Sequence, residues 1–334
     1  MMSAVVNSTD KDHSACSGCS LCLLVCPVWR QTRDITMTPH GRNKALQNGV
    51  GVAGIADSIN SCTLCMACEP VCPENIALVP MLLGMRRELA ELEPNRYADA
   101  LSMSRHVKMP QVSTPVSLLL GAAYFNDGQL PSRIRKLLCG AITICERDGT
   151  DIALELEAGA EISPAHLAEF LAPLRNAERV IVADGLLLRQ LRVWLPAMKV
   201  QSLGEALSKL PAVRSALRKS DLYVIEPRAY HSDYERLVKH YSVLRNERGC
   251  AFNLDLQRVA IPATVQSISQ RLGKAAANDD AQARWLLQGR KIGRIVVESL
   301  EDAAALARVA DIPIVHLADV VVAPMAAGKK SEVT

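Results

Sequence analysis

The chain has 334 residues, with 38 lysines and arginines against 35 aspartates and glutamates, so its formal net charge is +3. This near-neutral charge excludes a dedicated nucleic-acid-binding protein, which needs a strongly basic surface, and three tryptophans, six tyrosines and three phenylalanines are too few for a base-stacking platform. Hydrophobic residues make up 49% of the chain, which excludes wholesale disorder and, at this length, indicates two or three domains.

The N-terminal segment before the first cysteine lacks the apolar core of a signal peptide. No uninterrupted apolar run reaches the roughly 18–20 residues that a membrane-spanning helix needs. The longest candidates, 116–125 and 312–327, are too short or contain His316 and Asp319. We therefore expect a cytoplasmic protein without a direct membrane span, whose contact with any membrane would come through a partner.

Eight of the 11 cysteines lie in two short runs, unlike the spread cysteines of a disulfide-stapled scaffold. The first run contains Cys16, Cys19, Cys22 and Cys26, and the second contains Cys62, Cys65, Cys68 and Cys72. Each run reads C-x2-C-x2-C-x3-C-P, and every cysteine of the second follows its counterpart by 46 residues. This internal repeat is the signature of bacterial ferredoxins with two [4Fe–4S] clusters.

In such paired runs, the fourth cysteine of each run ligates the other cluster. We therefore assign cluster one to Cys16, Cys19, Cys22 and Cys72, and cluster two to Cys62, Cys65, Cys68 and Cys26. Zinc is the alternative, since eight thiolates could hold two zinc ions. Zinc does not require the third C-x2-C step or the C-x3-C-P ending, so the pattern favours two [4Fe–4S] clusters.

The 35 residues between Cys26 and Cys62 are too many for the hairpin of a compact β-rich ferredoxin. Helix-like sequence patterns occur at 41–48, 55–61 and 77–92, and a short helix is expected near 97–104. These patterns predict a helical dicluster module instead. Five arginines lie near the runs in sequence: Arg30, Arg33, Arg42, Arg86 and Arg87. They would raise the cluster potentials if they lie close to the clusters, whereas solvated arginines would have little effect.

Beyond a polar segment with a predicted boundary at 107/108, apolar strand-like runs alternate with helical patterns, which predicts α/β lobes with largely parallel sheets. Strands are expected at 116–122, 141–145, 179–183, 222–225, 294–298 and 313–317. Helices are expected at 132–138, 164–174, 186–195, 205–220, 232–247, 281–289 and 300–310. The segment that starts at Arg179, a predicted strand followed by a helix, resembles in sequence the segment that starts at Arg294. This resemblance indicates two similar lobes.

The predicted fold is thus an α+β multidomain protein, with an α-helical dicluster ferredoxin module at 1–107, α/β lobes at 108–205 and 206–327, and a disordered tail at 328–334. The chain has no glycine-rich phosphate-binding loop. His231 and His240, beside Tyr230, Tyr234 and Tyr241, are candidates for proton transfer. The favoured alternative for them is an ordinary amphipathic helix.

This layout resembles the heterodisulfide-reductase-like iron–sulfur proteins. That family includes fused C and B subunits of heterodisulfide reductase and the iron–sulfur subunits of glycolate oxidase and of anaerobic glycerol-3-phosphate dehydrogenase. The resemblance is specific in residues 16–73 and rests on element order and short phrases in the lobes. Lobes of the family carry Cys-Cys-Gly motifs, but the corresponding phrases here, 157–161, 182–188, 229–234 and 296–302, contain no cysteine. The resemblance therefore implies degenerate lobes.

We expect a non-catalytic electron-transfer subunit of a cytoplasmic oxidoreductase complex, in which two clusters relay single electrons to or from a flavoprotein or iron–sulfur partner. The alternative is a catalytic disulfide or heterodisulfide reductase with an extra cluster in the lobes. Only Cys139, Cys145 and Cys250 remain for such a cluster, and Cys250 is 105 residues away from the nearer of the other two. They are expected to be small buried hydrophobic residues rather than ligands.

Overall fold

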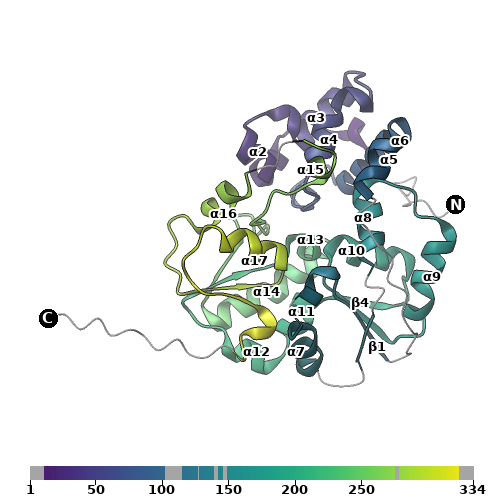
Figure 1. Ribbon diagram of the computed structural model, residues 1–334. Helices are drawn as coiled ribbons and strands as arrows, with labels where there is room; N and C mark the ends of the chain where they lie inside the picture. The colour runs from purple at the N-terminus through teal and green to yellow at the C-terminus, as the bar shows by residue number, and fades with distance from the viewer. Residues whose placement is uncertain are drawn as a thin grey trace.

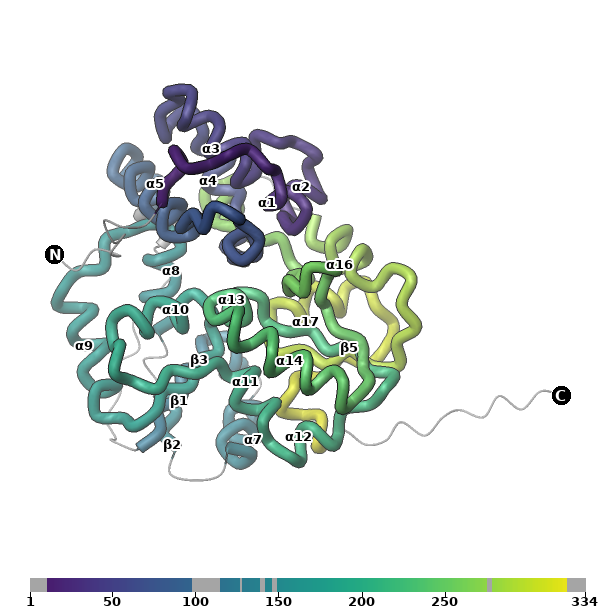
Figure 2. The backbone as a smooth tube through the Cα atoms, turned by 180° about the vertical axis from the view of Figure 1, so that it is seen from behind, coloured from purple at the N-terminus to yellow at the C-terminus, as the bar shows by residue number. Residues whose placement is uncertain are grey.

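The computed structural model describes residues 11–101, 115–126, 128–138, 142–145, 149–274 and 278–322. The boundary at 107/108, Cys139 and the expected tail at 328–334 lie outside these residues. The elements form an N-terminal helical module and two α/β lobes, and both views place the module against one end of the lobes (Figures 1 and 2). The predicted α+β multidomain fold is confirmed.

Short helices and 3-10 turns build the N-terminal module. Its helices are α1 (Leu21–Val25), α2 (Pro27–Thr32), α3 (Pro39–Gln47), α4 (Ala56–Ser61), α5 (Leu78–Leu92) and α6 (Pro94–Leu101), with 3-10 turns η1 (His13–Ala15), η2 (Ile35–Met37) and η3 (Val52–Ile55). Proline occupies the first turn of α2 and of α3, where its missing N–H costs no helical hydrogen bond. The long amphipathic α5 buries one face and thereby joins the module to the first lobe.

The first lobe contains a four-stranded parallel sheet in the order β2-β1-β3-β4. Its elements are β1 (Val116–Leu119), η4 (Ala122–Asn126), α7 (Leu130–Leu137), β2 (Ile142–Ile144), α8 (Thr150–Ala158), α9 (Pro164–Leu174), β3 (Arg179–Val182), α10 (Gly185–Trp194) and β4 (Lys199–Ser202). Two short helices, α11 (Leu203–Ser208) and α12 (Pro211–Ala216), lead to the second lobe. The division at 205/206 falls inside α11 and remains a prediction.

The second lobe repeats this topology with the parallel strand order β6-β5-β7-β8. Its elements are β5 (Asp221–Val224), α13 (Pro227–His231), α14 (Tyr234–Arg248), β6 (Ala251–Phe252), α15 (Ile268–Arg271), α16 (Asp279–Leu287), β7 (Arg294–Val297), α17 (Leu300–Ala307), β8 (Ile314–His316) and η5 (Leu317–Asp319). The two segments that resemble each other in sequence become β3 and β7, which occupy the same place in their sheets.

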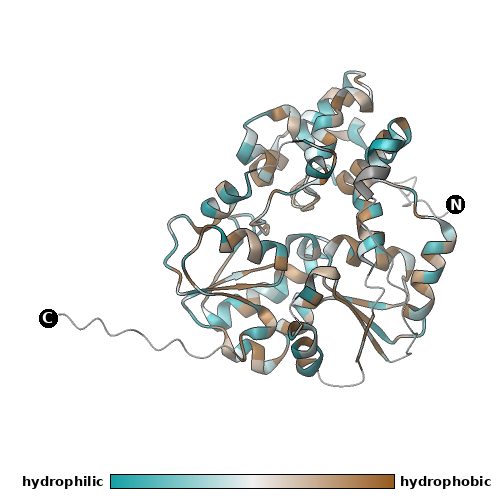
Figure 3. Cartoon of the chain, viewed as in Figure 1, coloured by the Kyte–Doolittle hydropathy of each residue, from teal (hydrophilic) through white to brown (hydrophobic). Residues whose placement is uncertain are grey.

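The strands are mainly hydrophobic (Figure 3), as expected for parallel sheets that are covered on both faces. One buried cluster joins α5 of the module to α8 and β3 of the first lobe, for example through Leu89, Leu156 and Val180. Another joins the two lobes through Ile181 and Tyr223. Continuous cores therefore connect the three parts. Among the described residues, no helix has the length and apolar character needed to cross a membrane.

Several expected elements differ from the structure. The expected helix at 205–220 is two helices, because Pro211 lacks an N–H and Leu210 before it is extended, with φ −71° and ψ 127°. The expected helix at 232–247 begins at Tyr234, after the separate helix α13. The expected strand at 116–122 ends at Leu119, because the chain turns at Gly121, where φ is +85°.

Sequence reasoning missed several elements: the strands β4 and β6, the helix α8, and the short helices α1, α2, α13 and α15. Strand β4 has Val200 as its one strongly apolar residue, and β6 has two residues, so neither shows a strand period. Helix α8 lies between Gly149 and Gly159, which have positive φ angles of 76° and 74°. These glycines mark both ends of a helix that the expected elements did not include.

We predict that Gly185→Ala destabilises the protein by about 1–3 kcal/mol or more, because the new methyl group would overlap the backbone of Arg228 and Ala229. This overlap would push α10 away from α13. Gly84→Ala in α5 is the matched control, since nothing lies within 4 Å of its added methyl group. It should stabilise the helix by about 0.5–1 kcal/mol. Urea unfolding midpoints measure both effects, and equal midpoints for the two variants would contradict the prediction.

Candidate iron–sulfur site

The two cysteine loops share an unusual backbone. The second and fourth residues after the first cysteine have positive φ angles in both loops: Gly18 (85°) and Ser20 (65°), then Leu64 (52°) and Met66 (62°). A left-handed conformation costs a non-glycine residue about 1–2 kcal/mol, so the surroundings must hold Leu64 and Met66, both buried, in place. Alternating conformations of this kind turn successive N–H groups toward one point and form anion-binding concavities, including iron–sulfur sites.

The structure brings Cys72 of the second run to the first loop. Burial is the main cause that raises the pKa of the Cys22 thiol to about 11, and the nearby sulfurs of Cys16, Cys19 and Cys72 contribute to the rise. These four cysteines are the set assigned to cluster one. Cys19 is exposed and the other three are half-buried, so this site opens to solvent.

The four cysteines assigned to cluster two, Cys26, Cys62, Cys65 and Cys68, line a single cavity. Burial raises the pKa of Cys26 to about 12, and the neighbouring Cys65 and Cys62 contribute to the rise. Apolar residues of the second loop and α5 line the rest of the cavity, together with Pro27, Val28, Pro39, Arg42 and Thr63. The second site is therefore more enclosed than the first.

The residues of both loops fit a cubane cluster. In the described part of the chain, no three cysteine, histidine or acidic side chains converge closely enough to hold a single metal ion. A cubane does not need such convergence, because each thiolate binds a different iron. Four thiolates around one cavity and a concave row of N–H groups suit a cluster with net negative charge.

Three side chains, of which Arg86 and His231 are buried and Arg228 is half-buried, hold the carbonyl groups of the second cysteine loop. Arg86 donates to the carbonyl of Cys62 at 2.6 Å, and Arg228 donates to that of Thr63 at 3.0 Å. His231 Nδ1 lies 2.7 Å from the carbonyl of Cys65. We call these three side chains the loop clamp. Arg228 and His231 both come from α13, so the second lobe shapes the loop of cluster two.

The tautomer of His231 follows from its two contacts. Its Nε2 accepts a hydrogen bond from the backbone N–H of Ala260 at 3.1 Å, so the proton is on Nδ1 and is donated to Cys65. Burial lowers the pKa of His231 to about 4, which keeps the ring neutral. His231 is thus a structural donor rather than a group that transfers protons at neutral pH.

The other arginines near the runs have different surroundings. The guanidinium of Arg30 lies over the ring of Trp285, 4.2 Å from its centroid, and that of Arg33 lies 5.8 Å from the ring of Trp29. Arg87 is half-buried. Arg42 and Arg86 are buried, so solvation is the wrong interpretation for these two arginines.

Comparisons with known proteins match this part of the chain. Residues 12–76, which span both runs, match the family model described as a 4Fe-4S dicluster domain. These residues form a 4Fe-4S domain. Over 144 residues the chain is 26% identical to YkgF, an uncharacterized electron transport protein of Escherichia coli (strain K12). That similarity covers 39% of this chain and 29% of YkgF. No solved structure matches the chain.

Of the remaining cysteines, the structure describes Cys145 and Cys250, which pack against different core clusters. Cys250 is buried in the core between the lobes, and Cys145 packs at the edge of another core cluster. Cys139 lies outside the described residues. Burial raises the pKa of Cys250 to about 11, as expected for an unreactive thiol.

His240 and the neighbouring tyrosines also have structural contacts. His240 Nε2 lies 2.9 Å from the hydroxyl of Ser208, and burial lowers the pKa of His240 to about 4. The hydroxyls of Tyr230 and Tyr234 donate to the carbonyls of Arg258 and Gln257. The hydroxyls of Tyr241 and Tyr223 both donate to the carboxylate of Glu298, each at 2.6 Å.

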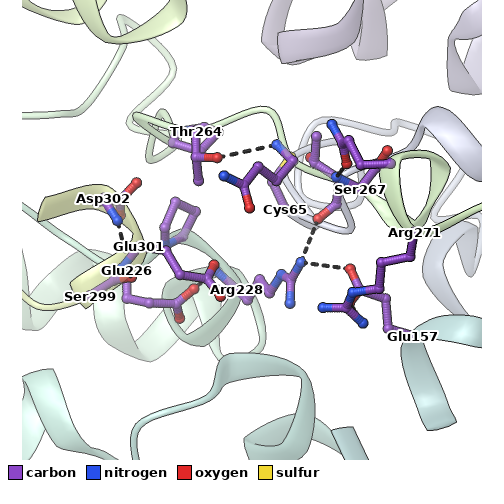
Figure 4. A pocket seen from close by; sticks show the side chains of 15 residues that line it. Cys65, Glu157, Glu226, Arg228, Thr264, Ser267, Arg271, Ser299, Glu301 and Asp302 are labelled. Atoms are coloured by element: carbon purple, nitrogen blue, oxygen red, sulfur yellow. Dashed lines mark hydrogen bonds and ion pairs between the residues drawn. The ribbon is translucent and has the colours of Figure 1, made fainter. Parts of the chain in front are cut away.

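A polar cleft lies between the 4Fe-4S domain and the lobes (Figure 4). Two adjoining pockets form it and share Glu157, Glu226, Arg228, Arg271, Ser299 and Glu301. The segments that follow β1, β3, β5 and β7 line it, and Cys65 lies in the wall on the side of the 4Fe-4S domain. Ligands of open α/β sheets bind at these carboxyl ends, where the strand order reverses. The cleft therefore places such a site beside a predicted ligand of cluster two.

Charged groups of both signs line the cleft. Figure 4 shows the guanidinium of Arg228 directed toward Glu157, which it contacts at 3.2 Å, while Arg271 lies 3.5 Å from the other oxygen of Glu157. Burial acts to raise the pKa of Glu157, but nearby arginines, Arg228 first, outweigh it and hold that pKa below its usual value. Burial raises the pKa of Glu226 to about 8 and that of Asp302 to about 7.

The sequence motifs did not indicate these cleft residues. The phrases at 157–161, 182–188 and 296–302 contain cleft residues, but their resemblance to cysteine motifs does not indicate a polar site. A usable signal was present, since a polar residue follows each of three buried strands closely: Asp184 after β3, Glu226 after β5 and Ser299 after β7. Because the carboxyl ends of parallel strands meet at one edge of a sheet, polar residues there mark a candidate site.

Crossed ligation predicts which cluster each fourth cysteine serves. Cys26→Ser should alter the electron paramagnetic resonance signal that Cys65→Ser alters, although Cys26 belongs to the first run. Cys72→Ser should alter the signal that Cys16→Ser alters. The reason is that the fourth thiolate of each run completes the other cluster. If Cys26→Ser and Cys16→Ser change the same signal, ligation is within runs and the assignment is wrong.

We also predict that replacing Cys139, Cys145 and Cys250 together by alanine leaves the iron content unchanged. Cys145 and Cys250 pack against different core clusters, which gives no indication of a shared metal site. A loss of stability of about 1 kcal/mol for each buried site is expected from lost packing. Iron analysis and thermal unfolding measure the two effects, and loss of a paramagnetic signal would indicate a further cluster.

Proposed function

We propose that this chain is an electron-transfer subunit of a cytoplasmic multi-subunit oxidoreductase complex, and that two [4Fe–4S] clusters in its 4Fe-4S domain relay single electrons. The grouping of the cysteines carries this proposal. Cys72 lies with the first run, and Cys26 lines the cavity of the second. Such crossed sets hold two clusters close together, which is the arrangement that a relay requires.

The different exposure of the two sites supports a relay with two ends. The site of cluster one opens to solvent at Cys19, where another redox protein can approach. The site of cluster two is enclosed and borders the cleft through Cys65. An electron that enters at one end can therefore leave at the other.

The expected partners are a flavoprotein or another iron–sulfur protein, and any attachment to a membrane comes from such a partner. The resemblance to heterodisulfide-reductase-like subunits and the printed description of YkgF as an electron transport protein both favour this role. The matching part covers 29% of YkgF, so membership of a multi-subunit complex is part of the proposal and is not implied by this similarity. The lobes would then serve mainly for docking.

A catalytic role at the cleft is the second candidate, and the reversal of strand order in both sheets favours it. The disulfide-reductase form of this role needs several thiolates for an extra cluster. Among the described residues that line the cleft, Cys65 is the one cysteine, and it belongs to the predicted set of cluster two. A cleft that binds a polar small molecule without a further cluster agrees better with these residues.

The proposal predicts about eight irons and eight sulfides per chain after anaerobic purification, with broad visible absorption that bleaches on reduction. Zinc thiolates would give a colourless protein and exclude the relay. The reduced protein should then reduce an added one-electron acceptor, and the combined variant Cys16→Ser, Cys65→Ser, which disturbs both clusters, is the control. Four irons per chain would contradict the two-cluster relay.

The partner is tested by anaerobic purification from the native host, where a flavin- or iron–sulfur-containing subunit should co-purify.

A further inference from the structure

Arg42 and Arg86 are buried cations that have no acidic partner of their own. Arg42 is 4% exposed and donates to the carbonyl of Ser58 at 3.0 Å and to its hydroxyl at 3.3 Å. Arg86 is 0% exposed and donates to the carbonyls of Cys62, Ile59 and Glu157. Within the described ranges, neither guanidinium forms an ion pair with a carboxylate.

The nearest acidic side chain does not balance these charges. Glu157 lies close enough for Arg86 to help hold its pKa below the usual value. Its two oxygens are already paired with Arg228 and Arg271, at 3.2 and 3.5 Å. Arg86, Arg228 and Arg271 therefore share the single carboxylate of Glu157. Arg42 has no such carboxylate among the described residues.

An uncompensated buried charge costs several kcal/mol, so a folded protein normally provides a counter-charge. Arg42 lines the same cavity as the four cysteines of the second site. Arg86 is bound to the carbonyl of Cys62, one of those cysteines. A cubane held by four thiolates carries net negative charge, so a cluster in this cavity would supply the missing counter-charge.

The first site has a weaker cationic neighbour. The ammonium of Lys44 donates to the carbonyl of Cys16 at 3.0 Å, but Lys44 is half-buried and the site opens to solvent at Cys19. Water screens the interaction of the Lys44 charge with a cluster. The enclosed surroundings of Arg42 and Arg86 strengthen the interaction of their charges with a cluster. Reduction makes a cluster more negative, so the buried arginines favour reduction of the inner cluster.

We propose that Arg42 and Arg86 are positioning residues that serve as the counter-charges of cluster two and make it the cluster that is reduced first. This inference rests on the proposed two-cluster relay. Electrons then collect on the inner cluster, at the wall of the cleft, and the exposed cluster one is the site at which the redox partner exchanges electrons with the chain.

A potentiometric titration of the full, anaerobically purified protein tests the order of reduction. Electron paramagnetic resonance follows each cluster, with a chemical reductant as the electron source, and the Cys16→Ser and Cys65→Ser variants assign the signals. In the wild-type protein, the signal of cluster two should develop at the higher potential. If cluster one is reduced first, the inference is overturned while the relay stands. If two [4Fe–4S] clusters are absent, the proposed function itself fails.

Charge-removing variants test the two arginines. Arg42→Gln and Arg86→Gln should each move the potential of cluster two lower and leave that of cluster one nearly unchanged, whereas Arg42→Lys and Arg86→Lys should retain most of the wild-type potential. Arg294→Gln is the matched control, because it removes a buried arginine that pairs with Asp221 in the second lobe. It should change neither potential.

Iron retention during exposure to a chelator gives a second readout that does not depend on redox activity. The glutamine variants should lose the iron of cluster two faster than the lysine variants do, because the uncompensated negative charge of the cluster destabilises the site. If the glutamine variants fold poorly, the lysine variants and the wild-type order of reduction still decide. An unchanged potential of cluster two in both glutamine variants would overturn the role of the arginines.

Discussion

Three side chains hold the carbonyl groups of Cys62, Thr63 and Cys65, and the shape of the second cysteine loop depends on them. The loop contains two non-glycine residues in left-handed conformations, which are costly unless neighbouring contacts over-determine them. The loop clamp provides such contacts from outside the loop. Because two of its members come from α13, the 4Fe-4S domain and the second lobe act as one structural unit.

Both lobes contribute residues to the cleft. Two sheets with the same strand order direct the carboxyl ends of their strands toward the 4Fe-4S domain, so that their binding edges lie on one cleft. Arg228 belongs to the cleft and to the loop clamp at once. A charged ligand that competes with Glu157 for this arginine would therefore also act on the loop of cluster two, through the carbonyl of Thr63.

The sequence was informative where chemistry restricts spacing. The repeated cysteine runs allowed both ligand sets to be predicted, and the structure places their members in the expected neighbourhoods, although the ligation itself stays a prediction. Apolar runs located most strands and helices. The loop clamp could not be predicted, because Arg228 and His231 are 165 and 166 residues away from their acceptors and carry no motif. The left-handed conformation of Leu64 and Met66 was equally hidden, since these residue types favour other conformations.

The same separation in sequence has a consequence for how the protein matures. A ribosome that adds about 5–20 residues per second needs roughly 10–30 s to pass from the second cysteine loop to α13. During this interval all eight cysteines of the two runs have been synthesised. The carbonyls of Thr63 and Cys65 still lack their side-chain donors, because Arg228 and His231 have yet to be added. The inner cluster site therefore reaches its final form only when the C-terminal half has folded. If the proposed clusters are present, we expect the inner site to be completed after the outer site, whose four assigned cysteines lie within residues 16–72.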